Sequence, residues 1–500
     1  MRDMWWQSIL AFVLYLILGI LKYRTGRYGV DTTYFVNALW NTLHGAFAYA
    51  SGANGSVLGQ HFGPLWLLML PGFAVWNSPV VIIVFKAALW GISVAAASIL
   101  AAENATSKIF QRIWVLFYCL HPVVMANFYW DFNEVHMALP ILMWLTVCMI
   151  KQKWTHVAAL AVLSWFTKED MPIVMLGVSA FLAIRYRKYK MAVGLAAASL
   201  AAFLIIVEYV MPSFPGGAKN LHWVYFAQLG GSLRAVVIKL LTQPQKMIFV
   251  PWAWRKLVFL TVLFASFGFL PLRKPVWLIC IMPTLFYLWI MYRPDVFHYH
   301  SHYVMPMIPF LFVSSITGFP ESKSAPRIAL ALAFSIAALL SLRYTLVFSS
   351  AFDTPENLKS VHRAVAMVAG CDKVCSDYMT GVYLALRPII DNFDLKTSVG
   401  PNCSTTFYDA YVLNLHLLYV MRGRSTEFLP ASYFVDEVFN LDRCENYHRA
   451  FHENGVVVWL RGKGESVGEP VTLREIKMDS PPERIDRIKN IFVGKITRPL

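Results

Sequence analysis

The sequence predicts an α-helical polytopic membrane protein with about eleven transmembrane helices and a smaller α/β domain at the C-terminal end. Hydrophobic residues make up 57% of the 500 residues and charged residues only 15%, whereas ordinary soluble domains have about 45–50% and about 25%. Apolar segments recur throughout residues 1–349. The formal net charge of +15 belongs to the same part of the chain.

The distribution of charge predicts two domains. Residues 1–349 contain 26 Lys and Arg against 10 Asp and Glu, whereas residues 350–500 contain 18 against 19. We therefore expect a membrane domain over 1–349 and an extracytoplasmic α/β domain over 350–500. Because no basic run is interleaved with stacking aromatic residues, the positive charge indicates membrane topology, and no nucleic-acid partner is expected.

The first apolar stretch runs from about Trp5 to Leu21 and predicts an uncleaved span, because no small-residue cleavage site follows it. Several of the expected spans reach the roughly 20 residues that a bilayer needs only if their polar ends are helical. The further spans are expected near residues 79–101, 112–129, 137–150, 155–167, 172–185, 190–211, 257–272, 275–292, 303–319 and 327–349.

The first outer loop, residues 22–78, is expected to carry interfacial helices. Its segment 61–76 is apolar but contains Pro64 and Pro71, which indicates an interfacial or re-entrant piece. If this segment spans instead, every later loop changes side. The distribution of Lys and Arg favours the first alternative and places the N-terminus in the cytoplasm and residues 350–500 outside a plasma or inner cell membrane.

Acidic residues cluster on the outer side of this topology. Because charges at membrane depth are costly, the cluster predicts a polar cavity that opens outward. The alternative is that outer loops carry acids simply as the counterpart of a positive inside. Seven of the ten acids of residues 1–349 fall at outer ends, namely Asp31, Asp131, Glu134, Glu169, Asp170, Glu208 and Asp295.

Asp31 stands just before an expected interfacial helix over residues 33–43. Aspartate is a preferred N-cap residue, which would be a purely structural role. The functional alternative is a carboxylate that takes a proton from an acceptor hydroxyl or binds a metal.

Two further motifs lie in short outer turns. Asp131 and Glu134 share a face in helical geometry, and with His136 they could hold a divalent cation such as Mg²⁺ or Mn²⁺, or tune an acid or base. Lys168-Glu169-Asp170 interrupts an apolar hairpin and indicates either a cavity-facing group or a salt-bridged surface turn. For both motifs a solvated turn is the structural alternative.

Histidines and cations complete the set of candidates. His298, His300 and His302 alternate before an expected span, a pattern compatible with a metal, with an anionic or sugar ligand, or with an ordinary interfacial position. Lys86 lies inside an apolar span, where it snorkels or meets a phosphate. Arg24, Arg27 and Arg293 are further phosphate-binding candidates. The chain has no Gly-x-x-x-x-Gly-Lys-Ser/Thr loop, which excludes a P-loop ATPase.

Several of these motifs together resemble a family of predicted prokaryotic membrane proteins of unknown function. The resemblance covers residues 28–215 well and the remainder loosely, and Asn133 stands where the family pattern has His. That family is in turn similar to the GT-C glycosyltransferases, which use polyprenyl-phosphate sugars. The motifs are Tyr28-x-x-Asp31, Leu39-Trp-Asn-Thr-Leu-His-Gly45, His61-Phe-x-Pro64, Asp131-Phe-x-x-Glu134 and Lys168-Glu-Asp170.

The resemblance implies an enzyme that moves a sugar from a polyprenyl-phosphate donor, held in membrane lipid, to a glycan, lipid or protein acceptor. Asp31 matches in position the essential acid in the first outer loop of GT-C enzymes and would deprotonate the acceptor. The phosphate would bind at Arg24, Arg27, Lys86 and Arg293. The sugar would be bound by Asp131, Glu134, His136, Lys168, Glu169, Asp170, His61, His298 and His302. The alternatives are a transporter or flippase of a lipid-linked or sugar substrate, and a non-catalytic membrane scaffold or sensor.

The outer tail predicts one α/β domain. A helix is expected over residues 356–369 and strands over 371–375, 407–413 and 455–460. An even number of cysteines in an oxidising compartment indicates one or two disulfides, and reduced thiols are the alternative. Three full pairings remain open among Cys371, Cys375, Cys403 and Cys444.

Overall fold

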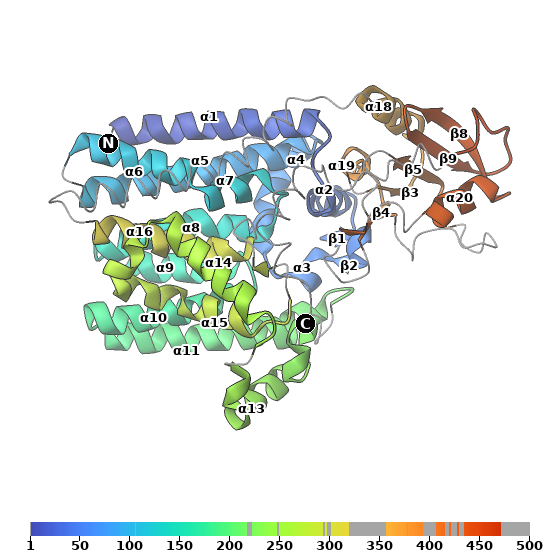
Figure 1. Cartoon of the computed structure of the whole chain (residues 1–500). Helices are drawn as coiled ribbons and strands as arrows, with labels where there is room; N and C mark the ends of the chain where they lie inside the picture. The colour runs from blue at the N-terminus through green and yellow to red at the C-terminus, as the bar shows by residue number, and fades with distance from the viewer. Residues whose placement is uncertain are drawn as a thin grey trace. The chain divides into compact units, whose positions relative to one another are not determined.

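The chain divides into two compact units, residues 1–354 and residues 355–500. Both contain helices, whereas the larger sheet lies in the C-terminal unit (Figure 1). The computed structural model describes residues 2–105, 107–217, 223–247, 250–293, 296–297, 302–319, 357–377, 379–393, 407–415, 420–421, 428–429 and 435–471.

The N-terminal unit is a helical bundle. Its first part comprises α1 (Arg2–Arg24), α2 (Val30–Leu43), β1 (Tyr49–Ala50), η1 (Ser51–Ala53), β2 (Gly55–Ser56), α3 (Val57–Gln60), η2 (Pro64–Met69), α4 (Leu70–Val75), α5 (Val80–Asn104), α6 (Lys108–Leu120), α7 (Pro122–Tyr129), η3 (Glu134–Met137), α8 (Ala138–Ile150), α9 (Trp154–Trp165), α10 (Met171–Tyr186) and α11 (Tyr189–Ile205). It continues with the π-helix η4 (Ile206–Val210), α12 (Met211–Ser213), η5 (Trp223–Leu229), α13 (Leu233–Thr242), η6 (Pro244–Met247), α14 (Ala253–Ser266), η7 (Leu270–Arg273), η8 (Pro275–Ile281), α15 (Met282–Ile290), η10 (His302–Met307) and α16 (Ile308–Gly318).

The long helices lie side by side, with α2, α3 and the β1–β2 hairpin at one end of the bundle (Figure 1). Helix α5 is central and packs against α1, α6 and α8. Small residues permit the close approach of α1 and α5: a Cβ at Gly91 would lie 3.1 Å from Phe12 Cβ, and Ser8 Oγ donates to Gly91 O at 2.6 Å. The fully buried rings of Trp90 and Trp114 fill the core.

Three described helices are long and apolar enough to cross a membrane, namely Trp5–Arg24, Val80–Asn104 and Tyr189–Ser213. The pair α6 and α7, bent by 42°, makes a fourth if it is one span. In Val80–Asn104, 67% of the 18-residue apolar stretch is buried inside the protein. In Trp5–Arg24 and Tyr189–Ser213 the buried share is only 22%. The outward apolar surface of these two helices is what a lipid environment requires.

The prediction of eleven full spans is therefore too high. Among the described residues, helix length supports three spans, or four if α6 and α7 form one. Helices α8, α9 and α10 have 13, 12 and 16 residues, or about 18–24 Å at ~1.5 Å per residue, against a hydrocarbon core of ~30 Å. In two other expected spans, 3-10 turns that contain Pro275 and Pro306 precede short α-helices. The expected span 327–349 lies outside the described residues.

Segment 61–76 forms η2 and α4. Its apolar helical part, Pro64–Val75, is one of the apolar helices of 10–17 residues, which are shorter than the candidate membrane spans. The interfacial helix expected at 33–43 begins earlier, at Val30. Gly29 is the N-cap residue and Asp31 lies in the first helical turn. The structural alternative for Asp31, an N-cap, is therefore wrong.

The C-terminal unit contains a five-stranded sheet in the order β4-β3-β5-β9-β8. Strand β3 pairs in parallel with β4 and β5, whereas β9 pairs antiparallel with β5 and β8. The elements are α18 (Leu358–Met367), β3 (Lys373–Ser376), α19 (Gly381–Leu384), β4 (Ile389–Asn392), β5 (Ala410–Asn414), β6 (Val420–Met421), β7 (Phe428–Leu429), α20 (Val435–Arg443), β8 (Tyr447–Glu453) and β9 (Val456–Arg461).

Each element expected in this unit lies within a few residues of its predicted range, because β5 and β9 are short apolar runs that are buried in the sheet and contribute Tyr411 and Trp459 to one cluster. Cys444 is disulfide-bonded, so four reduced thiols can be ruled out. Cys371 and Cys375 are thiols. Cys403 lies outside the described residues.

Candidate functional site

Polar side chains from four chain segments converge at the end of the bundle that carries α2. The segments are the first turn of α2, the residues after α3, the turn between α7 and α8, and the turn between α9 and α10. Each lies where a helix begins or ends, so polar residues there do not interrupt an apolar helix. Asp31 interacts electrostatically with Asp131, Glu134, His61 and Lys168, which come from the other three segments.

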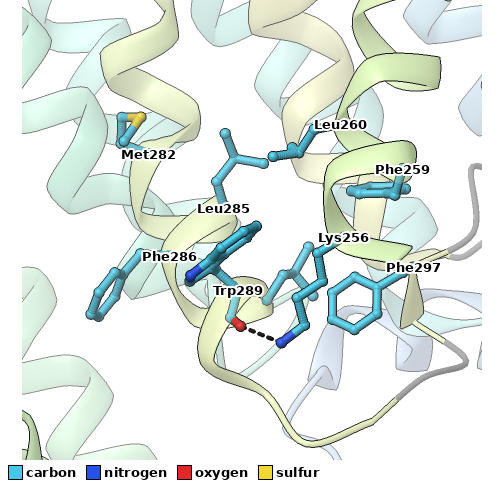
Figure 2. Close-up of a pocket in the computed structure, with 9 residues that line it drawn as sticks. Lys256, Phe259, Leu260, Met282, Leu285, Phe286, Trp289 and Phe297 are labelled. Atoms are coloured by element: carbon cyan, nitrogen blue, oxygen red, sulfur yellow. Dashed lines mark hydrogen bonds between the residues drawn. The ribbon is translucent and has the colours of Figure 1, made fainter. Parts of the chain in front are cut away.

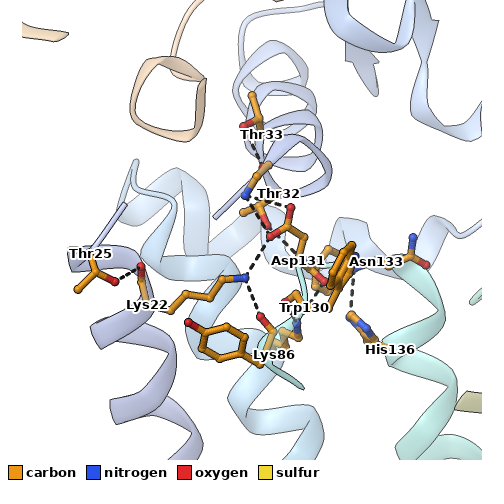
Figure 3. Close-up of polar contacts among 12 residues, drawn as sticks. Lys22, Thr25, Thr32, Thr33, Lys86, Trp130, Asp131, Asn133 and His136 are labelled. Atoms are coloured by element: carbon orange, nitrogen blue, oxygen red, sulfur yellow. Dashed lines mark hydrogen bonds and ion pairs between the residues drawn. The ribbon is translucent and has the colours of Figure 1, made fainter. Parts of the chain in front are cut away.

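Asp131 ties the α7–α8 turn to the start of α2 (Figure 3). Both of its carboxylate oxygens accept from the backbone N–H of Gly29 at 3.0 Å, and Oδ1 accepts from Lys22 Nζ at 3.1 Å. The backbone N–H of Phe132 adds a bond to Thr32 Oγ1 at 3.2 Å. With its side chain only 7% exposed, Asp131 holds the turn that carries Asp31.

Two lysines brace the same turn from the bundle side. Lys22 Nζ donates to Tyr129 O at 2.6 Å, and Lys86 Nζ donates to Trp130 O at 2.6 Å and Asp131 O at 3.2 Å. Figure 3 shows both lysines reaching toward this turn. The carbonyls at the C-terminal end of α7 lack helical partners and attract cations. Lys86, predicted to bind phosphate, is 1% exposed, and its Nζ donates to two of these carbonyls.

The second group of contacts joins His61, Glu134, Lys168 and Glu169. His61 Nδ1 lies 2.9 Å from Glu169 Oε1 and 3.7 Å from Glu134 Oε1, and Lys168 Nζ lies 3.4 Å from Glu134 Oε1. Glu134 and Lys168 are buried, with side chains 3% and 2% exposed. Neither Glu134 Oε1 nor Lys168 Nζ has a hydrogen-bond partner within the described residues. The two atoms form a buried ion pair with each other.

Gly63 allows the two loops to meet. A Cβ at this position would lie 2.5 Å from Thr167 O and 2.8 Å from Glu134 Cβ. The neighbouring backbone N–H of Phe62 donates to Glu169 Oε2 at 3.1 Å. The segment after α3 thus supplies both a ring nitrogen and a close backbone contact to the cluster.

One ligand atom from each of His61, Glu134 and Glu169 lies within 4.8 Å of the other two, which fits a divalent cation. This set differs from the expected Asp131, Glu134 and His136. Asp131 pairs with Lys22, whereas the His136 Nδ1 atom accepts from the backbone N–H of Asn133 at 3.1 Å. The positive charge of Lys168 beside Glu134 opposes a cation there.

The carboxyl groups of the site have perturbed acidity. The pKa of Asp31 is raised to about 7, first by burial and then by the carboxylates of Asp131 and Glu134, while His61 and Lys168 act in the opposite direction. Asp31 itself is only partly buried. Burial likewise raises the pKa of Asp170 to about 6, although Lys168 lowers it.

The sequence profile of a family of predicted membrane proteins, DUF2079, matches residues 25–370, and thereby includes all four segments of the site. The chain belongs to the DUF2079 family. No curated protein matches the chain. The DUF2079 match supports the membrane class.

The other candidates of this DUF2079 protein lie around the cluster or apart from it. Arg293 Nη1 donates to Tyr303 Oη at 3.2 Å, and Lys168 Nζ lies 5.0 Å from the centroid of the Tyr303 ring. Tyr303 therefore connects Arg293 to the site. His302 is half-buried beside Tyr303, with ring centroids 4.3 Å apart. His298 lies outside the described residues.

Arg24 is exposed at the end of α1, and Arg27 is partly buried near the site. Tyr287, which the sequence analysis did not select, donates its hydroxyl to Asp170 Oδ2 at 2.9 Å. Tyr303 was not selected either, although it directly follows the alternating His298, His300 and His302. Tyr287 belongs to an apolar segment with many aromatic residues, so no local signal distinguishes it.

Proposed function

We propose that this protein is an integral-membrane glycosyltransferase that moves a sugar from a polyprenyl-phosphate donor to an acceptor hydroxyl outside the cytoplasm. The observation that carries the proposal is the position of Asp31, a partly exposed carboxyl with a pKa raised to about 7, at the edge of the buried polar cluster. A base is most effective when its pKa lies near the working pH.

In this proposal Asp31 takes the proton from the acceptor hydroxyl as the oxygen attacks the anomeric carbon. The bond from that carbon to the phosphate oxygen breaks, and the lipid phosphate leaves. Asp131 acts as a positioning residue, because its bonds to Gly29 fix the first turn of α2.

The cluster beside Asp31 suits a sugar. His61, Glu169 and Lys168 offer both donors and acceptors to hydroxyl groups, and Tyr287 with Asp170 extends the polar surface. A Mg²⁺ or Mn²⁺ ion would be held by His61, Glu134 and Glu169. When bound, such an ion would supply positive charge to the site.

The leaving phosphate needs cations, and Arg293, Arg24 and Arg27 are the residues we assign to it. Arg293 is the best supported of these, because its contact with Tyr303 brings it close to Lys168. Preorganised positive charge stabilises the negative charge that develops on the phosphate. The proposal places the N-terminus in the cytoplasm and residues 350–500 outside.

A transporter or flippase would require polar groups along a path through the bundle. The deeper lysines Lys22 and Lys86 instead bind backbone carbonyls of the α7–α8 turn. This arrangement favours a site at one end of the bundle over a transport path.

The test uses the full-length protein in nanodiscs with a panel of radiolabelled polyprenyl-phosphate sugars, with and without Mg²⁺ or Mn²⁺. We expect sugar release or transfer with at least one donor and its loss in Asp31→Asn. Glu208→Gln, an acid in the π-helix η4, is the matched control and should keep full activity. Full activity of Asp31→Asn would overturn the role of Asp31. Movement of a labelled donor across the membrane of proteoliposomes, without bond cleavage, would support a transporter.

A further inference from the structure

A cavity lies between α14 and α15, lined by residues that the proposed reaction does not use (Figure 2). Its volume is about 290 Å³, and eight of its nine lining residues are hydrophobic. Met282 and Phe286 on its rim are 55% and 43% exposed, so the cavity opens on the apolar exterior of the bundle. A hydrocarbon chain suits such a lining.

The ninth lining residue is a buried cation. Lys256 is 1% exposed and runs between the rings of Trp289 and Phe297, as Figure 2 shows. Its Nζ donates to the backbone carbonyls of Trp289 and Met291, at the C-terminal end of α15. An ammonium group has three N–H donors, so one remains for a further acceptor. The two N–H donors that bind the carbonyls of Trp289 and Met291 cap the C-terminal end of α15.

The stretch of sequence that contains both helices of the cavity has an excess of positive charge. Between Glu208 and Asp295 the sequence contains nine Lys and Arg and no Asp or Glu. Helix α13 in this stretch has exposed apolar side chains, with Leu241 77% exposed, and a basic residue in its last turn. Trp289 Nε1 donates to Met247 O at 2.7 Å, which joins η6 to the cavity wall. Basic amphipathic segments of this kind bind anionic lipid surfaces.

We propose that this cavity binds one anionic phospholipid of the bilayer, with an acyl chain between α14 and α15 and its phosphate at Lys256 Nζ. The cavity is slightly smaller than the ~300–1,000 Å³ of sites that enclose a whole small ligand, so it surrounds part of one chain. Lys256 supplies the charge complementarity, and it lies in a stretch of sequence that contains no acid. The site is independent of the proposed transfer reaction.

The test measures lipid retention on the full-length protein by native mass spectrometry after delipidation and titration. The probes are phosphatidylglycerol, phosphatidylcholine and undecaprenyl phosphate. We expect phosphatidylglycerol to be retained at least tenfold more strongly than phosphatidylcholine. Lys256→Met should abolish this preference, whereas Lys246→Met, a lysine of η6 that does not line the cavity, should keep it.

A variant that fills the cavity, Leu285→Trp, tests the chain site separately and should reduce the retention of every lipid. Equal retention of the two phospholipids by the wild type would overturn the proposal. So would a lower melting temperature of Lys256→Met with unchanged lipid preference, because Lys256 would then only cap α15. If undecaprenyl phosphate is retained more strongly than phosphatidylglycerol, and Leu285→Trp abolishes that retention, the cavity would be reassigned to a prenyl lipid and the phospholipid assignment overturned.

Discussion

Both carboxylate oxygens of Asp131 accept from the backbone N–H of Gly29 at 3.0 Å, although the two residues are 102 positions apart in the sequence. Lys22 pairs with Oδ1 of the same carboxylate. The contact connects the α7–α8 turn to the helix that carries Asp31. The position of Asp31, the proposed catalytic residue, therefore depends on the buried ion pair between Asp131 and Lys22.

Asp131→Asn is expected to destabilise the N-terminal unit by about 3–5 kcal/mol, because it leaves Lys22 buried without its counter-charge. Thermal denaturation in mild detergent measures the effect. Glu103→Gln is the control: Glu103 pairs with Lys151 at 2.8 Å, but both side chains are about two-fifths exposed, at 43% and 40%. That pair should contribute less than about 1 kcal/mol. Equal losses in the two variants would contradict the assignment.

The pH dependence of transfer should follow Asp31. The base is the ionised form, so kcat/KM should fall about tenfold per pH unit below pH ~7 and level off above it. Steady-state assays from pH 5 to pH 9 check this, with circular dichroism at each pH as the control for folding. A flat profile across this range would rule out Asp31 as the base.

Stability should show the opposite trend. The pKa of Asp31 is raised in the folded protein, so the folded state binds the proton more tightly than the unfolded state, whose pKa is about 3.9. The free energy of unfolding should therefore decrease as the pH rises from about 4 to about 7. The contribution of Asp31 is a fraction of the roughly 4 kcal/mol that three pKa units represent, because the side chain is partly exposed. Melting curves of the wild type should be more pH-dependent than those of Asp31→Asn, and identical curves would refute the raised pKa.

Gly63→Ala should separate the two loops of the site. The added Cβ meets Thr167 O and Glu134 Cβ at 2.5 and 2.8 Å, and overpacking of this kind costs about 1–3 kcal/mol. Gly194→Ala in α11, where no atom lies within 4 Å of the new Cβ, should be neutral or more stable by up to about 1 kcal/mol. Melting temperatures and donor binding measure both variants. If Gly63→Ala keeps wild-type donor binding, the close approach is not needed for the site.

Mn²⁺ binding can be measured without any substrate. Electron paramagnetic resonance titration should show at least about tenfold weaker binding in Glu169→Gln and no change in Glu208→Gln. Lys168→Met should strengthen binding, because it removes a positive charge 3.4 Å from Glu134 Oε1. Unchanged affinity in Glu169→Gln would exclude the ion from this set of ligands.

The sequence by itself determined the features that depend on local patterns. Apolar composition predicted the membrane class, and short apolar runs predicted β5 and β9 within a few positions. The distribution of Lys and Arg predicted that Asp31, Glu134 and Glu169 lie on the same side of the membrane. This prediction needs only the order of the loops and no knowledge of how the helices pack. The family match over residues 25–370 agrees with the membrane class.

The tertiary structure alone decided which of these residues face one another. Asp131 pairs with Lys22, and Lys86 donates to backbone carbonyls. His61, and not His136, lies beside Glu134 and Glu169. Tyr287 reached Asp170 from a helix with no motif. Helix length and side-chain polarity are local properties that one sequence reveals, whereas contacts across about 100 residues depend on how the helices pack. That packing, and not the motif spacing, assembles the site at one end of the bundle.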